Sequence, residues 1–284
     1  MNFAIRGMLA ALLVLSAFAQ EPSAKGVNFY SLDREIRTGQ QVAGDLERSL
    51  PIIRVPRLDA YIAKLGALLA NYADRQFAYR FTVYEDRGFP SVAPAELLMP
   101  KDPFLGQPVE PVAVSGGPIF VPISLLANAQ NEAEFAFQLA HAMAHIALRH
   151  ATKAATRKEL VDLAMVALEN EGVTRVKAAR DGIVAPAAME FGLLTFIRAS
   201  ELQADKAATE MVAAAGYDPE EAIRYLEGKA ALGGGGLDKL MSAHPTPESR
   251  VAAVKARNQQ LPMHAYTTGT GEFAEMKALA GNIH

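Results

Sequence analysis

The chain contains no cysteine, and this absence removes several kinds of site at once. It excludes disulfides, a thiol nucleophile, a cysteine-ligated zinc and a lipid on an N-terminal cysteine, but it leaves the redox compartment open. A strong excess of charge is also missing, because the net charge is only −3 over 284 residues. That balance gives no reason to expect nucleic acid or an anionic membrane surface as a partner.

A hydrophobic run long enough to cross a bilayer is also lacking. Arg6 is followed by an apolar stretch over residues 7–19 that ends in Ala17-Phe18-Ala19. A membrane span needs about 20 apolar residues, and this stretch is shorter. A basic start, a short apolar segment and an A-x-A end predict a secretory signal peptide over residues 1–19, cut before Gln20. We therefore expect an exported protein, periplasmic or extracellular, with no stable membrane span after cleavage; an uncleaved anchor is the alternative.

Residues 20–284 remain, in a chain whose overall composition is that of a folded globular protein, with 50% hydrophobic and 21% charged residues. We expect them to form a single domain of the α+β class that is mostly helical. Apolar periodicity predicts helices over residues 31–50, 58–72, 131–150, 155–170, 183–197, 199–215, 219–232 and 247–259. Alternation predicts a strand over 77–84, and Gly116-Gly117-Pro118 separates two further short strands, 112–115 and 119–123. Residues 85–111 read as a loop, and the stretch after 259 is weakly patterned.

The predicted helix over residues 131–150 carries the first candidate site. His141 and His145 are four residues apart, so both imidazoles leave one helix face and can share a tetrahedral zinc ion. In H-E-x-x-H metallopeptidases, the residue after the first histidine is a glutamate that acts as general base on the zinc-activated water. Here that residue is Ala142, whose methyl group cannot accept a proton. His150, nine residues after His141, is expected on roughly the opposite face in a packing role.

A third metal ligand must come from elsewhere in the chain, and Glu201 is the strongest candidate. Asp205 follows one helical turn later, where it can accept the other ring N–H of a ligating histidine and fix its orientation. Two histidines and one glutamate leave a fourth position open, the arrangement of catalytic rather than structural zinc sites.

These motifs and the segments around them resemble the M48 family of zinc metallopeptidases, whose exported bacterial members pair an H-E-x-x-H helix with a downstream E-x-x-A-D helix. The resemblance runs from about Val27 to Lys255. Its other matching segments are Val27-Asn28-Phe29-Tyr30-Ser31, Gly116-Gly117-Pro118-Ile119-Phe120-Val121, Asn131-Glu132-Ala133-Glu134, Arg149-His150, Ala215-Gly216-Tyr217-Asp218-Pro219 and His244-Pro245 with Arg250.

The resemblance implies a zincin-like metallopeptidase domain with a small β-sheet packed beside the active-site helix. It implies one zinc ion held by His141, His145 and Glu201, with Asp205 behind them and His244 near the metal as a candidate oxyanion stabiliser. It also implies a substrate strand containing Gly117, Ile119, Phe120 and Val121. An extended or unfolded polypeptide is then the expected partner, pairing with the edge of the strand over 119–123.

Ala142 departs from the family pattern, and three explanations are open. The chain is a natural pseudopeptidase that binds zinc without cutting, or the alanine was introduced to inactivate a protease, or another carboxylate such as Glu134 or Glu190 replaces the base. A general base typically raises the reaction rate 10²–10⁴-fold. We therefore expect a metalloendopeptidase domain that is inactive or strongly impaired as written. The alternative from a different class is an exported peptide-binding or scaffold module that holds no metal.

Overall fold

The computed structural model describes residues 27–74, 76–87, 110–170, 184–232, 246–263 and 265–283. The predicted signal peptide and His244 lie outside these residues, and so does the side chain of Glu190. In the described parts, the helices are α2 (Leu32–Ser49), α3 (Pro56–Ala70), α4 (Ile123–Asn128), α5 (Glu132–Ala147), α6 (His150–Asn170), α8 (Val184–Ala214), α9 (Glu220–Leu232), α11 (Pro247–Asn258) and α12 (Gly271–Gly281). The strands are β1 (Arg80–Tyr84), β2 (Val112–Ala113) and β3 (Pro118–Pro122). The predicted class, α+β and mostly helical with a small sheet, is confirmed.

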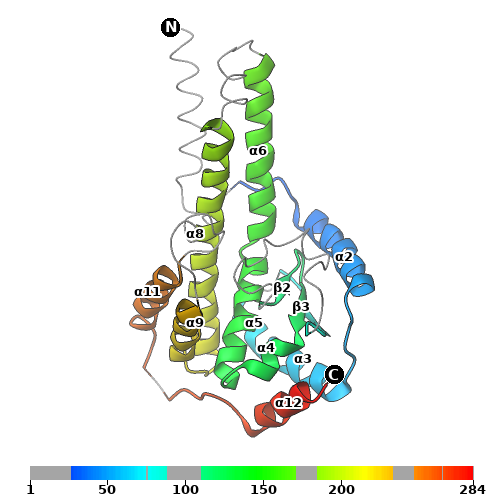
Figure 1. Cartoon of the computed structure of the whole chain (residues 1–284), viewed down its shortest axis with the longest axis vertical. Coiled ribbons are helices and arrows are strands. Elements are labelled where there is room, and N and C mark those ends of the chain that lie inside the picture. The colour runs from blue at the N-terminus through cyan, green and yellow to red at the C-terminus, as the bar shows by residue number, and fades with distance from the viewer. Residues whose placement is uncertain are drawn as a thin grey trace.

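The two longest helices, α6 and α8, run side by side, and the strands and shorter helices gather at one end of this pair (Figure 1). Helix α5 packs against α8 in that body and also contacts α3, α9 and β2. Among the described helices, none combines the length and the apolarity needed to cross a membrane.

Local side-chain chemistry explains where the predicted helices begin. Ser31 caps α2 by accepting a hydrogen bond from the Arg34 backbone N–H. Asn131 does the same for α5, accepting from the Glu134 backbone N–H at 2.9 Å. Glu132 and Glu134 occupy the first turn of α5, where the helix dipole favours carboxylates.

The sheet has the order β1-β3-β2, with β1 parallel and β2 antiparallel to β3. The predicted turn between β2 and β3 is present, and Gly117 in it has φ +126°, a conformation that favours glycine. A Cβ on Gly117 would also lie 2.3 Å from the Ala78 carbonyl oxygen. The edge expected over 119–123 is available only in part, because Ile119 and Phe120 are paired on both sides, whereas Val121 and Pro122 pair with β1 alone among the described strands. The outer strands of the described sheet are β1 and β2, and Tyr84 of β1 also forms an isolated bridge with Ile52.

Four elements differ from the sequence prediction, and the first is α8, a single helix where two were predicted over 183–197 and 199–215. Helix α5 ends at Ala147 instead of continuing to His150, because Arg149 has φ +58°, which interrupts the helical backbone. The short helix α4 directly follows β3 and was not predicted. Helix α12 lies in the stretch that the sequence left without a pattern, and its Phe273, Met276 and Ala280 are buried in the main core.

Candidate metal centre

The cluster predicted from sequence is brought together by the packing of α5 on α8. Nε2 of His141 and Nε2 of His145 are 3.0 Å apart. The Glu201 carboxylate, from α8, lies 3.4 Å from His141 Nε2 through Oε2 and 3.2 Å from His145 Nε2 through Oε1. These three residues form the group in the described chain that can hold a metal ion.

The donor atoms also fit a tetrahedral ion. Ligands bound about 2.0–2.1 Å from a zinc ion at tetrahedral angles lie roughly 3.3–3.4 Å from one another. The observed separations of 3.0, 3.2 and 3.4 Å are close to that value, and the two from Glu201 belong to different oxygens of its carboxylate. Two imidazole nitrogens and one carboxylate oxygen are moreover a donor set that suits zinc.

A charged pair supports His141 from behind. Nδ1 of His141 lies 3.0 Å from the Asp205 carboxylate, which is fully buried on α8 one turn after Glu201. Arg250, from α11, donates two hydrogen bonds of 2.7 Å to Asp205 and lies 3.9 Å from Glu201. Asp205 therefore lies behind His141, on the side away from Glu201 and His145, and Arg250 balances its charge.

The electrostatics follow from this arrangement. Burial by itself would raise the pKa of Asp205, yet the charge and hydrogen bonds of Arg250 keep it below its usual value. Burial would lower the pKa of His141, but the hydrogen bonds and charges of Asp205 and Glu201 outweigh it and raise the pKa to about 9. Without a metal ion, His141 therefore carries a proton at neutral pH, and a metal must displace it.

His150 lies beside the cluster rather than on the opposite side of the helix, which corrects the sequence prediction. Its Nδ1 is 3.2 Å from Nδ1 of His145, and its Nε2 is 3.3 Å from the Gln203 side-chain oxygen. Burial and the neighbouring His145 hold the pKa of His150 well below its usual value. The bend at Arg149 is the reason, since the prediction assumed an unbroken helix.

The remaining predicted residues fall in different places. Ala142 is buried among the apolar side chains of the main core. Glu134 accepts a hydrogen bond from the Gln130 backbone N–H at the start of α5, about two turns before His141. The strand residues Ile119, Phe120 and Val121 are also buried.

Glu110 is a carboxylate near the cluster that sequence reasoning missed. It precedes β2, and its Oε1 lies 3.9 Å from the Arg250 guanidinium. Arg250 itself was visible in the sequence only as one position of a matching segment. No spacing signal could have linked these two residues to the site, because each comes from a separate part of the chain.

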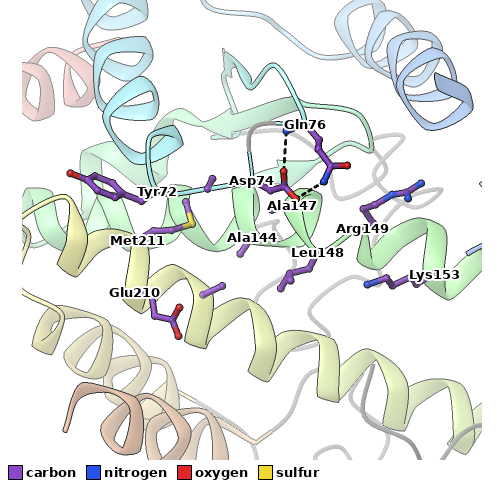
Figure 2. Close-up of a pocket in the computed structure, with 12 residues that line it drawn as sticks. Tyr72, Asp74, Gln76, Ala144, Ala147, Leu148, Arg149, Lys153, Glu210 and Met211 are labelled. Atoms are coloured by element: carbon purple, nitrogen blue, oxygen red, sulfur yellow. Dashed lines mark hydrogen bonds between the residues drawn. The ribbon is translucent and has the colours of Figure 1, made fainter. Parts of the chain in front are cut away.

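A pocket of about 360 Å³ opens against another side of α5, lined there by Ala144, Ala147 and Leu148 (Figure 2). Arg149, Lys153 and residues of α8 complete its wall, and none of the three clustered donors lines it. This pocket is separate from the candidate metal centre.

Comparison with known proteins gives a family match over the part of the chain that contains the three donor residues. The model for Peptidase family M48 matches residues 112–258, just over half of the chain. The chain is 24% identical to the beta-barrel assembly-enhancing protease of Yersinia pestis over 259 residues, which cover 88% of this chain and 49% of the relative. It is 24% identical to the Escherichia coli (strain K12) protein of the same name over 243 residues, 82% of this chain and 46% of the relative.

A plant protein is similar over a shorter stretch. The mitochondrial metalloendopeptidase OMA1 of Arabidopsis thaliana is 27% identical over 155 residues, which cover 55% of this chain and 30% of that protein. The chain spans about half the length of the bacterial relatives that it matches.

Proposed function

The chain belongs to peptidase family M48, and from this membership we propose that it binds one zinc ion and an extended polypeptide but cleaves poorly. His141, His145 and Glu201 would hold the zinc. The observation that carries the proposal is the convergence of these three donors within 3.0–3.4 Å, next to an alanine at the general-base position. When bound, zinc supplies a Lewis acid that lowers the pKa of a water and polarises a carbonyl.

The chain's own residues have separate tasks in this proposal. Asp205, 3.0 Å from Nδ1 of His141, would keep the Nε2 of that ring directed at the centre, and Arg250 holds Asp205 in place. Ala142 has no atom that can take a proton from water, so the general-base contribution is lost. His244 remains a proposed oxyanion stabiliser.

For the polypeptide, we propose binding along the sheet edge at β2 rather than along β3. Strand β2 contacts α5, and Glu110 at its start approaches Arg250, so this edge passes close to the cluster. An extended segment could add there by main-chain hydrogen bonding. Gly117, Ile119, Phe120 and Val121 would then support the binding strand from inside the sheet.

We place the protein outside the cytoplasm, as a periplasmic or extracellular protein, because of the signal-like residues 1–19. Mature protein that begins at Gln20 is the expected result of N-terminal sequencing after expression in a secreting host. For this chain, the activities and partners of the full-length bacterial relatives are proposals.

The restoring substitution Ala142→Glu tests the catalytic part. Cleavage of an unfolded substrate such as β-casein should be negligible for the unaltered chain and should rise roughly 10²–10⁴-fold in the variant, because a general base is regained. Ala142→Gln is the matched control, since its side chain has nearly the same size and cannot accept the proton, and it should stay inactive.

Brisk hydrolysis by the unaltered chain, with no gain in Ala142→Glu, would overturn the impairment. Glu110→Gln would then ask whether Glu110 serves as the replacement base. The metal part is tested by elemental analysis: we expect about one zinc per chain, lost in His145→Ala. A folded chain without zinc would favour the metal-free scaffold alternative.

A further inference from the structure

His145 has a second ring nitrogen, Nδ1, and His150 contacts it. The two Nδ1 atoms are 3.2 Å apart, and the rings meet edge to face with centroids 5.0 Å apart. Two ring nitrogens form a hydrogen bond only when one of them carries the hydrogen. The group bound to Nε2 of His150 decides which of the two Nδ1 atoms carries the hydrogen.

That partner is the side-chain oxygen of Gln203 on α8, 3.3 Å from His150 Nε2. An amide oxygen only accepts, so His150 must carry its hydrogen on Nε2. The Nδ1 of a neutral His150 then accepts from Nδ1 of His145. His145 in turn keeps the lone pair on Nε2, the atom that faces His141 and Glu201.

The backbone bend at Arg149 makes this contact available. In an unbroken helix, a residue five positions later points roughly 140° away, because each residue turns the helix by about 100°. Arg149 has φ +58°, which ends α5 and begins a new helix at His150. Its side chain is held by Glu35 at 2.7 Å and by the Tyr30 carbonyl at 2.6 Å, so the strained residue is anchored to the start of α2.

We propose that His150, held by Gln203 and by the bend at Arg149, is a positioning residue that fixes the tautomer and orientation of His145 for metal binding. The inference rests on the proposed function, since it concerns the same centre. His150 does for His145 what Asp205 does for His141, but with a neutral acceptor instead of a carboxylate. Outer partners of this kind typically change metal affinity 10–100-fold when they are lost.

The first experiment measures zinc affinity by competition with a chelator at fixed pH. His150→Phe fills the volume but cannot accept, and we expect it to weaken zinc binding about 10–100-fold. His150→Asn carries an oxygen close to the position of Nδ1 and should restore most of the affinity. Thr156→Val, an equally buried change on α6 that does not contact His145, is the control and should bind zinc as the unaltered chain does.

Normal zinc binding by a folded His150→Phe variant would overturn the inference while leaving the proposed function intact. Absence of zinc binding in the unaltered chain would instead count against the proposed function. A second measurement separates the two further: long-range ¹H–¹⁵N NMR of the metal-free, unaltered chain. It should find the hydrogen on Nε2 of His150 and on Nδ1 of His145; a His150 with its hydrogen on Nδ1 contradicts the inference.

Discussion

His141 and His145 sit one turn apart on α5, yet their outer ring nitrogens have partners of different charge. Asp205 is an anion whose charge Arg250 balances, whereas His150 is a neutral ring held by an amide. A carboxylate stabilises a protonated imidazole much more than a neutral acceptor does. His141 is accordingly the histidine whose pKa is raised to about 9.

This shift makes the stability of the metal-free chain depend on pH. The folded pKa of His141 is raised above its ordinary value of about 6.5. The contribution of this shift to the free energy of unfolding is therefore complete below pH 6.5 and disappears as pH rises through about 9. The loss should be on the order of 3 kcal/mol. Denaturant unfolding with a chelator present, at pH 6 and pH 9.5, measures it.

His141→Asn is the control for that measurement, because it removes the titrating group and should flatten the pH dependence over this window. The same drop in both proteins would assign the effect to another group. Zinc affinity should rise over the same range, since fewer protons must leave His141 on binding.

At the level of single residues, the sequence was informative where helical spacing applies. His141 with His145, and Glu201 with Asp205, are each separated by four positions within one helix, so their shared faces could be predicted. The contacts of Arg250, Glu110 and His150 could not. The first two depend on how separate segments dock, and the third depends on a backbone angle at Arg149 that no residue type in the sequence demands.

Among the elements, α2 packs closely against the β2–β3 turn. A Cβ on Gly39 would lie 1.6 Å from the Ser115 carbonyl oxygen, a backbone atom that cannot rotate away. Gly44, on the same helix, would meet only the far end of the Arg48 side chain at 3.5 Å. Alanine substitutions at these two glycines therefore distinguish the effect of close packing from the effect of helix propensity.

We expect Gly39→Ala to lower the free energy of unfolding by about 1–3 kcal/mol, because α2 must move away from the turn. Gly44→Ala should instead raise it by up to about 1 kcal/mol, since alanine is the better helix former. Urea unfolding midpoints of the two variants provide the test. Equal effects in both would mean that α2 does not pack on the turn.

Periodicity predicted most of the helices within a few residues, but it divided α8, the helix that carries Glu201, into two. It missed α4 and α12 for physical reasons. Helix α4 is only six residues long, too short to show a period, and its place after β3 is set by tertiary packing. In α12 the buried residues are Phe273, Met276 and Ala280, and apolar Ala274, Ala278 and Leu279 lie between them, so the apolar stripe has little contrast with the rest of the helix.

On the scale of the whole molecule, α12 and the residues just before it pack near the start of α5. Helix α12 packs against α4 and α3, and Lys277 donates to the Ala129 carbonyl at 2.7 Å. Just before it, the Thr268 carbonyl accepts from the Ala133 backbone N–H, one of the N–H groups that a helix start leaves unsatisfied. The end of the chain therefore supports the helix that carries both histidines.

Phe273→Ala should destabilise the fold by about 3–5 kcal/mol, because it removes a buried aromatic ring from the main core. Met263→Ala, at a fully exposed position nearby, should change stability by less than about 0.5 kcal/mol. Thermal unfolding of both variants checks this. A silent Phe273→Ala would mean that α12 is dispensable for the core.

The ion pair between Asp205 and Arg250 has a consequence for biosynthesis. The three donors and Asp205 all leave the ribosome before Arg250 does, because α11 follows them in the chain. Until that last helix docks, a nascent chain would hold two neighbouring carboxylates without their counter-cation. Completion of the centre should therefore be a late event during translation, timed by the arrival of a single guanidinium group.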